Sequence, residues 1–445
     1  MDCDEAPASS VRRPHFIADF RPRKSQAVRL AREAVLASLR AQETLTQHSQ
    51  HAQSVQHAHP VQRVENAPSS HPAQRTEPAP SSHPAQRTEP AQPLVLVAVS
   101  GGRDSLALLA VTILAARELN WRVAAVCVDH HMQPGSTQVA RNTRQVALGL
   151  GCEHAEIISI SVDPRRGGPE AAARAARYRA IAAHAKRIQA SAVLLAHTLD
   201  DQAETVLLGL LRSAGPDALV GMPPAFIRHD VAFLRPLLHI TRAQTTAICK
   251  AFGVQWWDDP TNGDSALSTS DLPLRSQIRQ RLIPLMKELG GEGVSEHLAS
   301  VAHHEQALRT SLERRVDELE RTYVKRLQGT DNLELPTSVL TDDEVLGSRL
   351  VMRLLKRANV EPNREKVRQV LNLASRPTLN TELRLLDRQG RVVSFKRVKS
   401  QESKSLRTSA SATTVPAATT VSAATTASAA RAALRIEFHR NTTFC

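Results

Sequence analysis

The chain has 445 residues, which is enough for two or three domains with sizeable cores. Its formal net charge of +13 favours a polyanionic partner, RNA or DNA above all, and the alternative is a basic enzyme whose charge only aids solubility. The five cysteines form no C-x-x-C pair and no run of 18 apolar residues occurs, so the composition predicts a cytoplasmic protein without disulfides, zinc or membrane spans.

The first 93 residues are predicted to contain one helix followed by a long polar insert. In residues 1–46, an amphipathic helix is expected over Ser25–Arg40, because apolar residues recur there on one helical face. Residues 47–93 are rich in His, Pro, Gln and Ser and contain APSSHPAQRTEP twice in tandem. Such a segment buries too little apolar surface to offset its ordering entropy, so we expect disorder.

From residue 94 onward, short apolar strands alternate with helices. The alternation predicts a doubly wound parallel sheet, an α/β fold that binds ligands at the carboxyl ends of its strands. We expect this domain to span residues 94–270. Its expected strands are 94–99, 123–128, 155–161 and 192–196, and its helices begin near Leu106, Ser136, Pro169 and Asp200.

The first strand ends in a turn with the sequence Ser-Gly-Gly-Arg-Asp-Ser. Glycines let the main chain approach an anion, and the N–H groups of a helix start attract phosphate oxygens. Asp104 is suited to cap the helix or to hold the Mg²⁺ that accompanies a nucleotide. The turn predicts a phosphate site made by Ser100, Gly101, Gly102, Arg103, Asp104 and Ser105.

The densest polar cluster follows the fourth strand. Helical spacing places four of its side chains on one face: His197, Asp200, Asp201 and Glu204. Three carboxylates together would repel one another unless a metal ion, an ammonium group or arginines neutralised them. The alternative is a solvated helix start, where acids are favoured by the helix dipole.

Other polar residues are ambiguous when taken alone. Asp129 and His130 follow the second strand. Arg174 and Arg177 lie on adjacent turns of a helix, where they are suited to grip phosphates or to form an ordinary surface. Arg212 lies at a helix end before a loop that contains glycine.

Beyond residue 270 the pattern becomes mainly helical. An apolar stripe over 298–327 predicts one long helix with a charged outer face. A capping box at Thr341–Glu344 and a proline at position 362 predict two more helices. Apolar runs over 383–395 predict a hairpin, and 405–445 is expected to be a low-complexity tail.

Seven sequence blocks, taken in order, resemble the tRNA(Ile)-lysidine synthase family of PP-loop ATP pyrophosphatases. They are SGGRDS (100–105), VDHH (128–131), EAAARAARY (170–178), HTLDDQAET (197–205), LLRSAGPDALVGM (210–222), LRPLL (234–238) and DPTN (259–262). The long helix is similar to that family's tRNA-facing domain, which we place at 271–404. The chain departs from the pattern at Arg103, where the family usually has a small or apolar residue. In the family an Arg-Asn-x-Ile-Arg segment follows DPTN within a few residues, whereas here an insert at 263–274 precedes it and Ser276 replaces the asparagine.

The resemblance implies that ATP adenylates C2 of the wobble cytidine in the CAU-anticodon tRNA(Ile), and that L-lysine then displaces AMP to form lysidine. It implies ATP and Mg²⁺ as cofactors, with Mg²⁺ at Asp104, and leaves open whether the chain forms a homodimer. Catalysis is assigned to Asp104, His197, Asp200, Asp201 and Glu204, with the acids binding the lysine ammonium and accepting its proton. Nucleotide contacts are assigned to residues 100–105, Asp129 and His130. Contacts to tRNA or lysine are assigned to Arg174, Arg177, Arg212 and Arg279.

Three other functions remain open from the sequence. A tRNA thiolase would use the same loop but needs a sulfur-carrying cysteine, for which Cys127 and Cys152 are candidates. An amidotransferase-type synthetase would share the loop without the positive charge. A non-catalytic, ATP-dependent RNA-binding module would have no use for the acids at 197–204.

Overall fold

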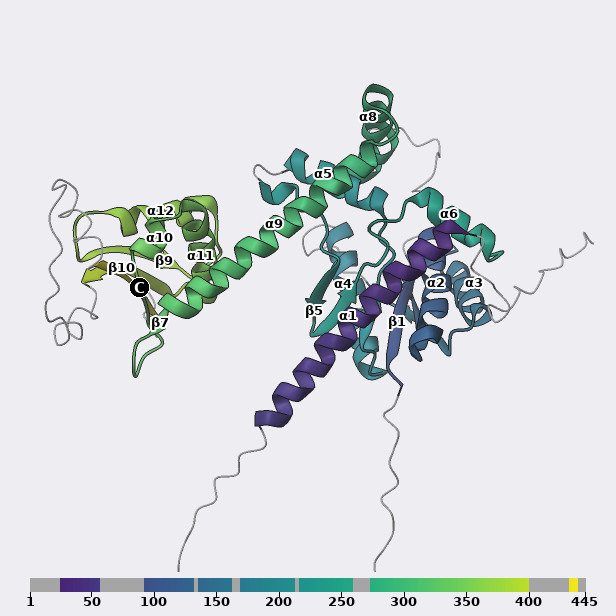
Figure 1. The fold of residues 1–445 in the computed structure, drawn as a ribbon, viewed down its shortest axis with the longest axis horizontal. Coiled ribbons are helices and arrows are strands. Elements are labelled where there is room, and N and C mark those ends of the chain that lie inside the picture. The colour runs from purple at the N-terminus through teal and green to yellow at the C-terminus, as the bar shows by residue number, and fades with distance from the viewer. Residues whose placement is uncertain are drawn as a thin grey trace, which may run out of the picture. The chain divides into compact units, whose positions relative to one another are not determined.

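The computed structural model describes residues 25–56, 92–131, 135–161, 169–212, 216–258, 273–399 and 432–438. Two compact units divide the chain, residues 1–305 and 306–445 (Figure 1). The insert from 57 to 91, the DPTN sequence and most of the expected tail lie outside the described residues.

The first unit is built on a six-stranded sheet with the order β3-β2-β1-β4-β6-β5. All neighbouring strands pair in parallel except β5 and β6, which form an antiparallel edge. The predicted doubly wound parallel sheet is therefore confirmed. The strands are β1 (Leu94–Val99), β2 (Arg122–Asp129), β3 (His154–Ser159), β4 (Ala192–Leu194), β5 (Ala225–Arg228) and β6 (Val231–Leu234).

Helices cover both faces of this sheet because side chains alternate along each strand. Val95 and Val97 pack in a core with α1, α2, α3 and α6, whereas Leu94 and Leu96 pack in a second core with α4. The helices are α1 (Gln26–Gln56), α2 (Arg103–Leu119), α3 (Ser136–Leu150), α4 (Pro169–Arg187), α5 (Leu199–Arg212) and α6 (Arg242–Ala251), and a short helix η3 (Pro216–Ala218) follows α5.

The N-terminal helix is longer than predicted. It packs along α2 through Val28, Ala31 and Val35, as its apolar face predicts (Figure 1). It runs on past Arg40 to Gln56, so the first residues of the expected disordered insert are helical.

A third core in the first unit holds the segment that follows residues 259–272, which lie outside the described residues. Ile278 and Ile283 pack with Leu207 of α5 and with Leu298. The segment changes from α-helix to a π-helical turn and back, which aligns Arg275 and Arg279 toward α5. Its elements are α7 (Leu274–Gln277), η4 (Ile278–Leu282), α8 (Ile283–Gly290) and α9 (Val294–Tyr323).

The second unit combines helices with a five-stranded sheet of the order β7-β8-β11-β10-β9. Leu350, Leu354, Phe395 and Leu434 are fully or almost fully buried between the sheet and its helices. The predicted hairpin at 383–395 is confirmed as β9 and β10. The elements are β7 (Lys325–Arg326), β8 (Leu333–Pro336), α10 (Ser338–Thr341), α11 (Glu344–Arg357), α12 (Arg364–Ser375), β9 (Thr381–Leu386), β10 (Val392–Lys399) and β11 (Ala432–Phe438).

Two predictions for this unit are wrong. The expected capping box at Thr341 does not form, because Asp343 caps α11 by accepting bonds from the N–H groups of Val345 and Leu346. Residues 432–438 are not part of a structureless tail, since β11 fills the sheet between β8 and β10.

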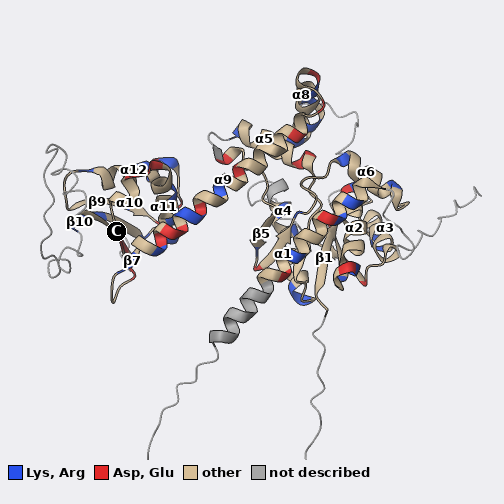
Figure 2. Ribbon diagram, viewed as in Figure 1, with Lys and Arg blue, Asp and Glu red and all other residues tan. Residues whose placement is uncertain are grey.

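The long helix α9 also differs in part from its predicted packing. Val316 of the apolar stripe is buried, whereas Val301 and Leu308 are exposed. Part of its charged face is paired within the second unit, where Glu313, Asp317 and Glu320 form ion pairs with Arg353 of α11. Figure 2 shows acidic and basic residues alternating along α9.

Among the described helices, none has the length and apolar character that crossing a membrane requires.

We expect β11 to be essential for the second unit. Leu434 is fully buried, so Leu434→Ala should lower the free energy of unfolding by about 2–5 kcal/mol. Leu386→Ala is the matched control, since Leu386 is 58% exposed on β9 and its loss should change stability by about 0.5 kcal/mol or less. Denaturant unfolding, monitored by hydrogen exchange at β10 and β11, measures the stability change of both variants. Equal effects from the two substitutions would contradict the role given to β11.

Candidate active site

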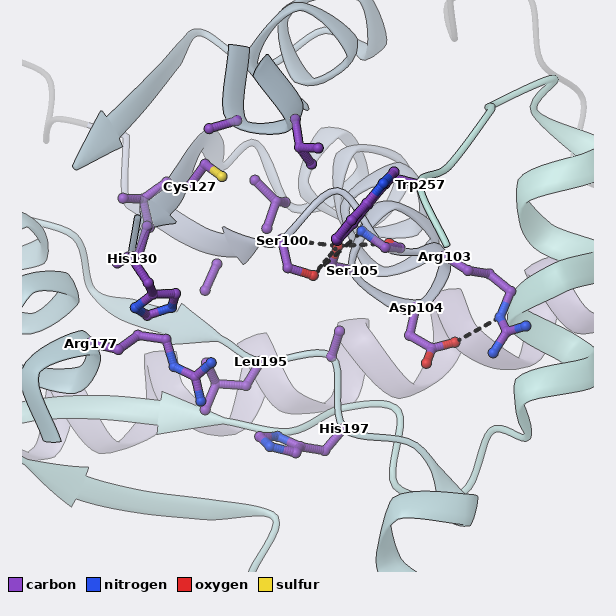
Figure 3. A pocket seen from close by; sticks show the side chains of 18 of the residues that line it. Ser100, Arg103, Asp104, Ser105, Cys127, His130, Arg177, Leu195, His197 and Trp257 are labelled. Atoms are coloured by element: carbon purple, nitrogen blue, oxygen red, sulfur yellow. Dashed lines mark hydrogen bonds and ion pairs between the residues drawn. The ribbon is translucent and has the colours of Figure 1, made fainter. Parts of the chain in front are cut away.

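A pocket of about 810 Å³ opens at the carboxyl ends of β1, β2 and β4. The phosphate turn after β1 and the polar cluster after β4 both line it, as the sequence predicts. Figure 3 shows His130 and Arg177 on one side of the pocket and Arg103 and Asp104 on the other. Its polar lining includes Ser100, Asp104, His130, Arg177, His197 and Asp201.

The turn after β1 is held by its own hydrogen bonds and by a glycine with positive φ. Gly101 has a φ of +84°, and a Cβ there would lie 2.4 Å from Thr143 Oγ1, so only glycine fits. Ser105 Oγ donates to Gly102 O at 2.8 Å and accepts from Ser100 N at 3.1 Å. No side chain caps α2, so its first N–H groups lack a capping partner, and the residues of its first turn line the pocket.

Asp104 does not cap the helix, which was one of its two predicted roles. Its Oδ1 accepts from Thr245 Oγ1 at 2.5 Å and from Arg103 Nε at 3.2 Å, and its Oδ2 lies 3.8 Å from Arg242 Nε. A single carboxylate that lines the pocket fits a Mg²⁺ ion whose other ligands are phosphate oxygens and water. The described residues include no cluster of three or more His, Cys, Asp or Glu that would hold a metal by itself.

Three arginines neutralise the acids of α5. Glu204 is fully buried and lies 2.9 Å from Arg242 Nη1, 2.8 Å from Arg275 Nε and 2.6 Å from Arg279 Nε. Asp201 lies 2.8 Å from Arg242 Nη2 and 3.3 Å from Arg275 Nη2. The sequence allowed a metal ion, an ammonium group or arginines as partners of these acids, and the structure places arginines beside them.

The arginines keep both carboxylates ionised. Burial alone would raise the pKa of Asp201, but Arg242 and Arg275 outweigh it and lower that pKa to about 2. Burial likewise opposes the net lowering of the Glu204 pKa, which Arg279 and Arg242 cause. A carboxylate with so low a pKa is a weak base, so Asp201 is poorly suited to accept a proton. Its Oδ1 pairs with the arginines, and its Oδ2 accepts from Thr198 N at 2.9 Å and from Thr198 Oγ1 at 3.0 Å.

The predicted catalytic acids therefore separate in space. Asp201 lines the pocket, but Glu204 lies behind it with both oxygens bound to arginines. Asp200 accepts the Arg242 N–H at 2.8 Å and lines a neighbouring cavity of about 480 Å³. Direct contact of Glu204 with a lysine ammonium does not fit this geometry, because arginines occupy both of its oxygens. Helical spacing alone predicted the contact, since it does not reveal the arginines.

Two histidines in the pocket carry buried ring nitrogens without a hydrogen-bond partner among the described residues, His130 Nδ1 and His197 Nδ1. Burial, helped by Arg235, lowers the pKa of His197 to about 3. Burial and Arg177 also lower the pKa of His130. Both rings are therefore neutral at pH 7, and their orphaned nitrogens indicate positions where a ligand completes the hydrogen bonding.

The other predicted contacts have mixed placements. Asp129 lines the pocket, but its carboxylate accepts from Ser136 Oγ and Thr137 Oγ1, each at 2.7 Å, and so fixes the start of α3. Arg177 and Arg279 line the pocket. Arg174 instead contacts Tyr178 Oη at 3.3 Å, and Arg212 is exposed at the end of α5.

Sequence reasoning missed the residues that complete the site. Arg242 and Thr245 come from the first turns of α6, which begins after a capping box made by Thr241 and Gln244. In the sequence, that box shows where a helix starts, but it does not show that the helix start lies at the pocket. Arg275 belongs to a segment that the resemblance singled out, although only Arg279 of that segment was chosen.

Comparison with known proteins finds relatives for the part of the chain that contains this pocket. A family model described as the PP-loop domain matches residues 80–286. The tRNA(Ile)-lysidine synthase of Bifidobacterium longum subsp. infantis is 49% identical over 229 residues, 51% of this chain and 59% of that protein. The one from Bifidobacterium animalis subsp. lactis is 44% identical over 60% of this chain and 70% of that protein.

A solved structure gives a weaker likeness. The U34-tRNA thiolase NcsA from Methanococcus maripaludis, with its [4Fe-4S] cluster, is 16% identical with a TM-score of 0.39, over 48% of this chain and 71% of that chain. The chain spans about three fifths of the B. longum relative, yet it covers more than two thirds of the B. animalis relative at 44% identity. It therefore belongs to the tRNA(Ile)-lysidine synthase family.

Proposed function

We propose that this chain uses ATP to join L-lysine to C2 of the wobble cytidine in a CAU-anticodon tRNA(Ile), releasing AMP and pyrophosphate. The observation that carries the proposal is one pocket with a phosphate-binding turn on one wall and an ionised, arginine-bound aspartate on another. The net charge of +13 suits an RNA partner, and the family provides the substrate class.

The first step is activation of the cytosine. Its C2 oxygen is a poor leaving group and must be activated first. The oxygen attacks the α-phosphorus of ATP, and the bond between that phosphorus and pyrophosphate breaks. The N–H groups at the start of α2 stabilise the charge that develops on the phosphates. Asp104 would hold Mg²⁺, which neutralises phosphate charge when bound.

The second step is attack by the ε-amine of lysine at C2 of the adenylated cytidine, which expels AMP. A free lysine amine titrates at about 10.4, so it must lose a proton before attack. Asp201 stays ionised, and the ammonium form binds there by replacing Arg275 or Arg279 at Oδ1, because Oδ2 already accepts from Thr198. The proton passes to water or to the departing AMP, because neither Asp201 nor neutral His197 is basic enough to hold it at pH 7.

The described cysteines argue against the thiolase alternative. Cys127, Cys152 and Cys249 are buried, and burial raises the pKa of each thiol to about 12. A thiol of that pKa carries almost no thiolate at pH 7, and the thiolate is the nucleophilic form.

The proposal is tested by incubating the full chain with ATP, labelled lysine and a CAU-anticodon transcript, followed by mass spectrometry of the anticodon nucleosides. We expect label at C2 of cytidine. Asp104→Asn and Asp201→Asn should each lower the rate by about 100-fold or more, since each removes a charge in the pocket. Asp230→Asn is the matched control, because the Asp230 side chain is 91% exposed and forms its ion pair with Lys186 outside the pocket. Full activity of both pocket variants would contradict the site assignment.

Glu204 is expected to act through the arginines. Glu204→Gln leaves three guanidinium groups around a neutral amide, so it should destabilise the first unit by about 3–5 kcal/mol. Glu156→Gln, which weakens a half-exposed pair with Arg187, should cost about 1 kcal/mol or less. Thermal and denaturant unfolding of the two variants measures the difference. A Glu204→Gln protein as stable as the control would mean that the arginines do not depend on this carboxylate.

A further inference from the structure

Trp257 is placed at the pocket without a role in the reaction described above. Its side chain lines the pocket and is 37% exposed. Its backbone N–H donates to Gly101 O at 3.0 Å, so the residue is fixed to the phosphate turn itself. Figure 3 shows the indole ring beside the turn that carries Ser100 and Ser105.

The segment that holds this ring is anchored on its other side. Trp256 packs against the core of the first unit, and its Nε1 donates to Asp258 Oδ1 at 2.9 Å. Two neighbouring tryptophans therefore have different environments: Trp256 faces the core, and Trp257 faces the pocket. Anchoring at both points holds the main chain of Trp257 beside the turn after β1.

Tyr178 also lines the pocket, but neighbouring side chains already cover its ring. Tyr178 is only 3% exposed. Phe226 and Phe233 pack against it at centroid distances of 5.9 and 5.3 Å, and the Arg228 guanidinium lies 4.6 Å from its centre. Among the described residues that line the pocket, Trp257 is thus the tryptophan, tyrosine or phenylalanine whose ring remains open to a ligand.

An open indole beside a phosphate site suits a flat, uncharged ring whose own phosphate is held next to it. We propose that Trp257 is the stacking platform for a nucleobase, and thereby a specificity-determining residue of the reaction. The base is either the adenine of ATP or a base of the RNA, since both present the same π-face. This inference rests on the proposed function for its ligands.

Attachment to Gly101 gives the stacking a second consequence. A base on Trp257 and a phosphate on the turn would be held by two segments that are joined directly, because Trp257 N–H donates to Gly101 O. A nucleotide that makes both contacts therefore loses less freedom than two separate ligands would. Trp257 should favour complete nucleotides over inorganic phosphates.

The experiment measures binding to the full chain and to its Trp257→Leu and Trp257→Phe variants. The ligands are ATP, inorganic triphosphate and a CAU-anticodon stem-loop RNA. Trp257→Leu should weaken binding of the ligand that supplies the base by about 5- to 150-fold, the range for loss of one base–aromatic stack. Trp257→Phe keeps an aromatic face and should bind within a few fold of the unchanged chain.

Tryptophan emission gives an independent readout. The unchanged chain should show a change in emission with ATP or with the RNA, and Trp257→Leu should lose it. Trp121→Phe is the matched control, because Trp121 is buried away from the pocket and its removal should leave the ligand-dependent change in place. A change with ATP but not with triphosphate identifies adenine, and a change with RNA alone identifies an RNA base.

Two results would overturn the inference. One is an equal emission change with triphosphate alone, which would show that Trp257 reports only the phosphate turn. The other is Trp257→Leu binding both ATP and RNA as tightly as the unchanged chain. Because these are binding measurements, stacking without lysidine formation would reject the proposed function and leave this inference standing, and lysidine formation without stacking would do the reverse.

Discussion

One buried carboxylate connects the parts of the site that are far apart in sequence. Glu204 on α5 binds Arg242 at the start of α6 and both Arg275 and Arg279 on the segment that includes η4. Each guanidinium also lies within 4 Å of Asp201, so two carboxylates and three arginines form one network. Removing any member would leave buried charge without compensation, which is why the α5, α6 and η4 segments depend on each other here.

The network also explains why acids and a phosphate site occur together. Uncompensated carboxylates beside the turn after β1 would repel ATP. Arg242 bridges Asp201 and Glu204 and lies near Asp104, so the acid cluster presents guanidinium N–H groups as well as carboxylate oxygens. A pocket with both kinds of group fits the proposed reaction, in which a triphosphate and an amine would have to lie in the same pocket.

Local patterns predicted the sheet and the phosphate turn because both arise from neighbouring residues. Apolar strands and the Gly101–Gly102 turn are readable directly. The partners of Glu204 were not readable, since Arg275 follows it by 71 positions and nothing near it signals the contact. The strand β11 was missed for a related reason: it follows a Ser/Thr/Ala-rich stretch, and only pairing with β8 and β10 identifies it as part of a core.

A buried ion network is not the cheapest way to stabilise this fold. Apolar side chains of similar volume are often as stabilising as a buried ion pair, so stability alone does not account for Glu204. What apolar residues would not supply is orientation. A carboxylate that accepts bonds from three guanidinium groups fixes their planes before any ligand arrives, and Arg242 and Arg279 both reach the pocket from that fixed position. Charge held in place in advance costs little reorganisation when a phosphate enters, and this preorganisation is the advantage that the network gives to the site.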